Sequence, residues 1–150
     1  LVMCLGCLSG CSGIWYNVAY NDRSEFGFNE DHDLVLRDAT SIKSLNEMKA
    51  LCDECNYSAY DENSEHYSNQ VDRIIRGYDE GFFEKKALIV YAFWGNESIK
   101  ISSIRVDETK LIVNIGIKRG TFNAIAIKWL FLIEVKKADI EGVTTVQVKQ

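Results

Sequence analysis

Residues 87–94 read Ala-Leu-Ile-Val-Tyr-Ala-Phe-Trp, an unbroken apolar and aromatic stretch that stops at Gly95-Asn96. A strand with one wet face alternates between apolar and polar residues, so a strand that is apolar on both faces needs cover on both sides. The sequence therefore predicts a central strand over 87–94, with the rest of the chain packed against its two faces.

A hairpin is predicted next, around a turn at 107–110. Apolar residues alternate along its second strand, as they do in a strand with one buried face. Along its first strand the alternation changes phase after Ile101, so Ile104 would point to the opposite face of an unbroken strand. An extra residue at Ser102-Ser103 resets the phase, and the sequence predicts a β-bulge there.

Two more strands are predicted downstream. Residues 120–123 are interpreted as a connection, and residues 124–135 as a strand because β-branched and aromatic residues are frequent in them. A weaker strand, expected at an edge of the sheet, contains Val143, Val146 and Val148.

The N-terminal half predicts an amphipathic helix. Apolar residues recur at three- and four-residue steps from Ile42 to Cys52, and Ser44-x-x-Glu47 has the spacing of a capping box. Thr40 or Ser41 could instead begin the helix one turn earlier. The helix should end near Cys55-Asn56.

Three shorter elements complete this half. Leu34-Val35-Leu36 is interpreted as a strand, and a second helix is predicted to close near Gly77. Residues 79–84 are predicted as a turn that places Phe82 and Phe83 in the core. The expected fold is α+β, with a mostly antiparallel sheet in the C-terminal half covered by one or two helices from the N-terminal half. The residues expected to be most buried are Phe82, Leu88, Val90, Val113, Trp129, Phe131 and Ile133, with Leu111 and Ile115 following Val113.

Length and composition favour one globular domain, since the chain has 150 residues, of which 47% are hydrophobic and 26% charged. The net charge of −5 is unevenly distributed. Residues 21–84 carry 16 acidic and 6 basic side chains (−10), and residues 85–150 carry 6 acidic and 11 basic (+5). One interpretation places acidic helices and loops against a mildly basic sheet, and the other gives the sheet a basic face that docks an anionic partner. No nucleic-acid-binding motif accompanies the basic residues, so nucleic acid is not an expected partner.

Residues 1–11 are uncharged, apolar and rich in small residues. They are too short to span a membrane but are typical of the end of a signal peptide. Leu8-Ser9-Gly10-Cys11 resembles the bacterial lipobox, in which cleavage before the cysteine leaves it to carry lipid. The sequence therefore predicts lipidation at Cys11, further upstream residues including Lys or Arg in the full gene product, a flexible tether over 12–33 and a single domain over 34–150.

Two short segments contain residues of the types that bind metal ions. Cys4-x2-Cys7-x3-Cys11 could supply thiolate ligands, but the residues between them are mostly apolar. Glu30-Asp31-His32-Asp33 contains hard-metal ligands but no turn-forming glycine, which favours a solvated loop. His66 is expected on the surface, and no catalytic triad can be assembled from the two histidines. No metal or cofactor is predicted.

The C-x-x-C pair in Cys52-Asp53-Glu54-Cys55 is the one spacing in the sequence that could support chemistry at the cysteines. A C-x-x-C pair at a helix amino terminus supports disulfide exchange, but this pair lies at a carboxyl end beside two carboxylates. Three alternatives stay open for Cys52 and Cys55: a structural disulfide, a redox pair, and one buried thiol beside one exposed thiol.

The C-terminal half contains the aromatic turn Tyr78-Asp79-Glu80-Gly81-Phe82-Phe83, the long strand that follows it and the closing Ile133-Glu134-Val135. In these features it resembles a group of small exported bacterial proteins that are similar to the C-terminal domain of the PrcB protease-complex subunit. The resemblance covers about residues 78–150 and implies an antiparallel sheet. It carries over no catalytic residue.

The leading functional prediction is a non-catalytic, lipid-anchored domain on the extracytoplasmic face of the bacterial cell membrane. Its expected partners are the membrane, through the lipid, and a protein or another component of the envelope. One alternative is a thiol-redox or metal-handling protein that uses Cys52 and Cys55. Another is an accessory subunit of a secreted protease complex.

Overall fold

A mixed sheet forms the centre of the computed structural model, which describes residues 13–29, 31–64 and 69–150. The strands in this part of the chain are β1 (Tyr16–Arg23), β2 (Thr40–Ile42), β3 (Lys86–Asp107), β4 (Lys110–Lys136) and β5 (Thr145–Lys149). They follow the order β1-β4-β3-β2, and β5 pairs with β4. The β4–β5 pair is parallel and the other pairs are antiparallel. The predicted α+β class, with a mostly antiparallel sheet, is confirmed.

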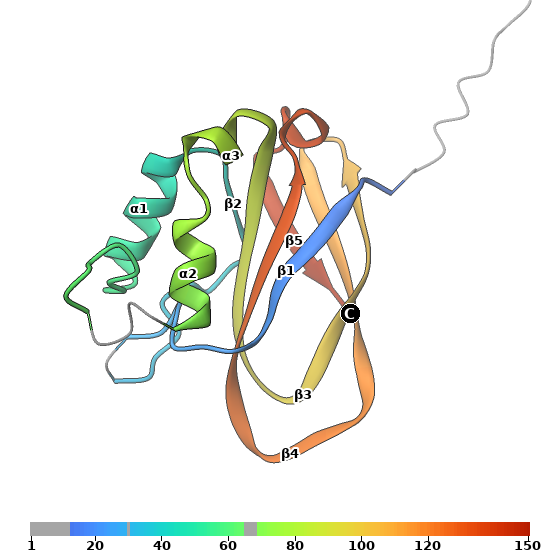
Figure 1. Ribbon diagram of the computed structural model, residues 1–150. Coiled ribbons are helices and arrows are strands. Elements are labelled where there is room, and N and C mark those ends of the chain that lie inside the picture. The colour runs from blue at the N-terminus through green and yellow to red at the C-terminus, as the bar shows by residue number, and fades with distance from the viewer. Residues whose placement is uncertain (1–12, 30, 65–68) are drawn as a thin grey trace, which may run out of the picture.

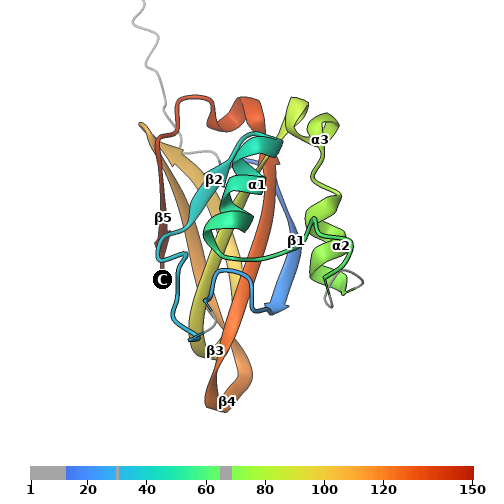
Figure 2. The ribbon, with the colours of Figure 1, turned by 90° about the vertical axis from the view of Figure 1, so that its left-hand side faces the viewer.

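The helices lie together on one side of this sheet (Figure 1), as the view turned by 90° also shows (Figure 2). They are α1 (Leu45–Glu54), α2 (Gln70–Arg76) and α3 (Glu80–Lys85), and a short 3-10 helix, η1 (Lys137–Ile140), follows β4. The predicted N-cap Ser44 begins α1, and its hydroxyl accepts from the Glu47 backbone N–H at 3.2 Å. The Glu47 carboxylate accepts at 2.7 Å from the N–H of Lys43, one residue before the N-cap, whereas in a full capping box it would accept from the Ser44 N–H.

Both faces of the strand are covered over residues 87–92, as their composition predicts, whereas Trp94 at the end of the apolar stretch is 45% exposed. Leu88, Val90 and Ala92 belong to the apolar cluster beneath the helices. Ala87 and Ile89 belong to a second cluster on the other face. Side chains alternate along a strand, so one apolar segment contributes to two cores.

The second core forms because the long β3–β4 hairpin bends back over its own first half (Figure 1). Ile104 and Val113, on the far half of the hairpin, share a cluster with Ile89 and Phe131 on the near half. Glu97 is paired with Phe122 at the bend, and the register shifts on both sides of this pair. The hairpin therefore builds two layers out of two strands.

The predicted bulge at Ser102-Ser103 is confirmed. Ile101 pairs with Ile115 and Ser103 pairs with Asn114, so Ser102 is the extra residue. The shift brings Ile99 and Ile104 into the same buried cluster despite their opposite parity.

The predicted tether over 12–33 is wrong for the part that forms β1. Tyr16–Arg23 pairs antiparallel with β4, from Tyr16 opposite Val135 to Arg23 opposite Trp129. Residues after β1 also pack closely. Gly27 has a φ of +90°, and a Cβ there would lie 2.7 Å from the Cβ of Ala92 on β3.

Three other local predictions need correction. Leu34 forms only an isolated bridge with Phe28, and the short strand of this region is β2 instead of 34–36. Residues 120–123 lie within β4 and are not a separate connection. Residues 80–85 form α3 in place of a turn, with the Asp79 carboxylate accepting from the Phe82 N–H at 2.8 Å.

The core prediction is confirmed for six of its seven residues. Leu88, Val90, Val113, Trp129, Phe131 and Ile133 are buried. Phe82 is only partly buried, because α3 directs its neighbour Phe83 into the core. Leu111 is fully buried, and Ile115 is partly exposed at the edge of the second core.

Candidate functional site

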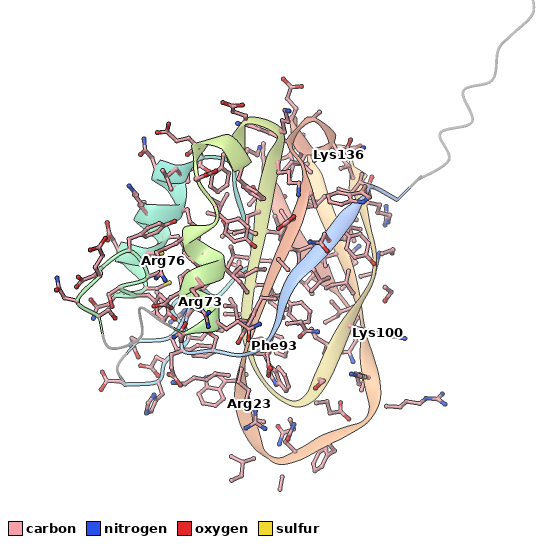
Figure 3. The ribbon with its side chains drawn as sticks, viewed as in Figure 1. Arg23, Arg73, Arg76, Phe93, Lys100 and Lys136 are labelled. Atoms are coloured by element: carbon pink, nitrogen blue, oxygen red, sulfur yellow. The ribbon has the colours of Figure 1, made fainter. Side chains whose placement is uncertain are left out.

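A cleft of about 740 Å³ opens at the end of the sheet where β3 begins and β4 ends. Lys86 and Lys136 are directly paired across these two strands. Tyr16, the first residue of β1, pairs with Val135, so Trp15 arrives at the same end of the sheet. Lys136 lies at this end in Figure 3, close to where β1 begins. The described residues that line the cleft are Trp15, Lys43, Glu84, Lys85, Lys86, Lys136, Lys137, Ala138 and Glu141.

The lining is strongly basic. Of these described residues, five are lysines and two are glutamates. The Trp15 ring, the Ala138 methyl group and the aliphatic stems of the lysines supply apolar surface between the charges.

Three of the lysine ammonium groups are held by neighbouring elements. Lys86 Nζ lies 2.8 Å from Glu134 Oε2 and 5.4 Å from the centre of the Trp15 ring. Lys137 Nζ donates to the Phe83 carbonyl of α3 at 2.9 Å, and Lys43 Nζ donates to the Val143 carbonyl at 3.0 Å. The cleft therefore has a defined wall made from α3, β3, β4 and η1, together with Trp15 just before β1 and Lys43 just after β2.

This arrangement suits the binding of an anion attached to an apolar group. Lysine ammonium groups donate hydrogen bonds to anionic oxygens, and the excess of positive charge in the lining, five lysines against two glutamates, raises the local concentration of anionic ligands. Trp15 is 46% exposed and offers an amphipathic ring beside the cations.

This site is not among those predicted from the sequence, although the sequence contains a signal for it. Lys85-Lys86 precedes the central strand and Lys136-Lys137 follows the closing one. Only the strand register shows that the two pairs meet. Trp15 was assigned to the supposed tether and was therefore not considered as part of the domain.

Cys52 on α1 and Cys55 at its C-cap are free, buried thiols, each 2% exposed. Burial raises the pKa of Cys52 to about 12, and the neighbouring Cys55 and Asp53 act in the same direction. Burial, followed by Glu54, raises the pKa of Cys55 to about 11. Disulfide exchange requires a thiolate, so these shifts oppose the thiol-redox alternative.

The remaining predicted site residues are placed as follows. Cys11, Cys4, Cys7, Glu30 and His66 lie outside the described residues. Among residues 13–29, 31–64 and 69–150, no three His, Cys, Asp or Glu side chains come together as metal ligands. In the described part of the chain no helix has the length and apolar character needed to cross a bilayer.

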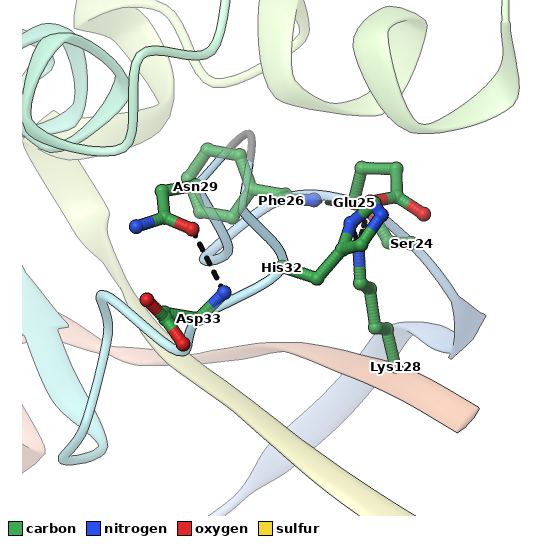
Figure 4. A network of polar contacts seen from close by, with 7 residues as sticks. All are labelled: Ser24, Glu25, Phe26, Asn29, His32, Asp33 and Lys128. Atoms are coloured by element: carbon green, nitrogen blue, oxygen red, sulfur yellow. Dashed lines mark hydrogen bonds and ion pairs between the residues drawn. The ribbon is translucent and has the colours of Figure 1, made fainter. Parts of the chain in front are cut away.

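A second polar cluster lies where the loop after β1 meets β4 (Figure 4). The ammonium group of Lys128 forms an ion pair with Glu25 and lies 2.7 Å from His32 Nδ1. An ammonium group can only donate, so His32 accepts through this nitrogen. Lys128 Nζ also lies 5.3 Å and 5.8 Å from the ring centres of Phe28 and Trp94. Both polar contacts of Lys128 join the loop to the sheet. We therefore interpret the cluster as structural, because it holds the loop against the sheet.

No protein-family model, curated protein or solved structure significantly matches this chain. The resemblance to the PrcB-type domain therefore stays a prediction.

Proposed function

We propose that the protein is a lipid-anchored, non-catalytic domain on the extracytoplasmic face of the bacterial cell membrane, and that its lysine-lined cleft binds an anionic partner of the envelope. The observation that carries the proposal is the position of the cleft. It opens at the end of the sheet where β1 begins, and Cys11 precedes Trp15 of the cleft by four residues.

The anchor is supported by the sequence. Leu8-Ser9-Gly10-Cys11 has the small residues that precede a lipidated cysteine, and the residues before it are uncharged. Buried acyl chains contribute about 0.8 kcal/mol per methylene, and two chains hold a domain stably on a bilayer.

Anionic binding is supported by the charge of the lining. Five lysines and two glutamates among the described lining residues give an excess of positive charge in a cleft of about 740 Å³. An acidic envelope component would gain electrostatic attraction and apolar contact there.

Metabolic labelling tests the anchor. Expressed from its full gene in a bacterial host, the wild type should partition with membranes and incorporate labelled palmitate. Cys11→Ser should accumulate as unprocessed precursor without label. Equal labelling and fractionation of the two proteins would refute the anchor.

Affinity capture from solubilised envelopes tests the cleft. An envelope component should be retained by the wild type and lost from Lys85→Glu/Lys136→Glu. The matched control is Lys100→Glu/Lys149→Glu, which makes the same charge change at exposed lysines that do not line the cleft. Equal capture by both double variants would show that the cleft is not the binding site.

A further inference from the structure

We infer that the anionic partner is the phospholipid bilayer that carries the Cys11 lipid, and that the lysine-lined cleft with Trp15 docks on its headgroups. This inference rests on the anchor of the proposed function and identifies the partner of the same cleft. It makes the domain a peripheral membrane module with a fixed orientation, in place of a domain held away from the bilayer.

The chain between Cys11 and Trp15 is too short to hold the domain away from the bilayer. Trp15 is the fourth residue after Cys11, and a fully extended chain spans at most about 3.6 Å per residue, or roughly 14 Å over these four steps. β1 begins at Tyr16 and pairs at once with Val135 of β4. A lipid on Cys11 therefore holds the Trp15 end of the sheet close to the membrane surface.

Exposed lysines lie at the same end of the sheet as Trp15. Lys85 and Lys136 are exposed, and both line the cleft. At physiological salt, electrostatic attraction acts over about 8 Å, so only basic residues near the bilayer contribute. A lysine near an anionic membrane strengthens binding by about 1 kcal/mol, which is about fivefold. Glu84 and Glu141 oppose this attraction and make it moderate.

The exposed ring of Trp15 also favours contact with a membrane surface. Trp15 is 46% exposed beside a lysine whose ammonium lies 5.4 Å from its ring centre. Tryptophan is enriched at membrane–water interfaces because its ring is amphipathic. The pairing of an exposed tryptophan with lysines favours a headgroup region over a purely aqueous anion.

Vesicle cosedimentation of the complete chain carrying Cys11→Ser tests the inference without the lipid. Binding to neutral phosphatidylcholine vesicles measures the contribution of the apolar residues 1–10. Replacing part of the lipid with phosphatidylglycerol should strengthen binding, and raising the salt to roughly 0.5 M should remove the gain, because the screening length shortens.

Variants in the same background locate the contact. Lys85→Ala/Lys136→Ala should weaken binding to phosphatidylglycerol vesicles by about 25-fold. Trp15→Ala should weaken it as well, and Glu84→Gln should strengthen it. Lys100→Ala/Lys149→Ala removes the same charge outside the cleft and should change binding less than about twofold; Lys100 is separated from Lys136 in Figure 3.

Three outcomes would overturn the inference. The first is equal loss of binding in the two double variants, and the second is equal binding to neutral vesicles and to vesicles with phosphatidylglycerol. The third is retention of a protein from envelopes by the cleft of a chain that does not bind anionic vesicles, which would assign the cleft to an acidic protein. Lipidation of the wild type at Cys11 would then leave the proposed function standing while this inference fails.

Discussion

Lys128 shows how a single charged side chain is accommodated next to a hydrophobic core. Its side chain is only 9% exposed, whereas that of its partner Glu25 is 69% exposed. Water can therefore solvate Glu25 when the pair is broken, but it cannot easily solvate Lys128. The two partners should respond unequally to substitution.

We expect Glu25→Ala to lower the free energy of unfolding by about 1–3 kcal/mol, because it removes the ion-pair partner of a buried ammonium, whose other contacts among the described residues are His32 and the rings of Phe28 and Trp94. Lys128→Met, which keeps the aliphatic stem, should cost less than about 1 kcal/mol. Urea unfolding measures both values. The double variant should be no less stable than Lys128→Met alone, and a cost equal to the sum of the two single variants would show that the residues are not coupled.

The buried thiols predict a dependence of stability on alkaline pH. The pKa of Cys52 is about 12 in the folded protein against an ordinary value of 9.0. Folding therefore favours the protonated thiol. Its stabilising contribution is fully present below pH 9 and is lost as the pH rises toward the folded value, because the unfolded chain releases the proton first.

Between about pH 8 and about pH 10, Cys52 should lower the free energy of unfolding by about 1 kcal/mol. Urea midpoints measured at the two pH values test this expectation. Cys52→Ala should show a smaller decrease than the wild type over the same interval. An identical decrease in both proteins would contradict the thiol assignment.

At the level of elements, periodicity was informative wherever one face of a strand was buried. The parity change between Ile101 and Ile104 was sufficient to place the bulge, because both residues must reach the same core. β1 escaped detection because Asn, Asp and Arg dominate its second half, and its pairing is imposed by β4. β2 has three residues, too few for a periodic pattern.

The bulge predicts an unusual tolerance to deletion. Removing Ser102 gives Ile99, Ile101, Ile104 and Val106 a single parity and lets the existing pairs with β4 continue in regular register. The free energy of unfolding should then change by less than about 1 kcal/mol. Deleting Lys100 instead turns Ile101 out of the core and should be clearly more destabilising. Thermal unfolding compares the two, and equal damage would contradict the role assigned to Ser102.

The two-layered hairpin predicts that the position along β4 decides the effect of removing a phenylalanine. Phe131 is fully buried, and Phe131→Ala should cost about 3–5 kcal/mol. Phe122, near the bend, is 73% exposed, so Phe122→Ala should cost less than about 0.5 kcal/mol. Melting curves of the two variants make the comparison, and similar melting temperatures would contradict the layered core.

At the scale of the whole molecule, the sequence predicted the class of fold more completely than the candidate site. Apolar runs and alternation locate sheet and helices because burial is a local property of each element. The cleft depends on which lysines the register brings together, here Lys86 and Lys136, and on Trp15 belonging to the domain. Pairing between distant strands is a tertiary property that one sequence does not display.

The same geometry gives the molecule two distinct ends. The cleft and the start of β1 occupy one end, and the bend of the hairpin, with exposed Phe122 and Ile125, lies at the other (Figure 1). An anchor at Cys11 would turn the cleft toward the bilayer and the bend away from it. The proposed orientation of the molecule on the bilayer therefore depends on whether Cys11 carries lipid.

The mass of the N-terminal peptide of the mature protein, extracted with detergent from the membranes of a host that expresses the full gene, tests this point most directly. The account predicts a peptide that begins at Cys11 and carries the added mass of acyl chains. A peptide in which Gly10 is still joined to an unmodified Cys11 would contradict it.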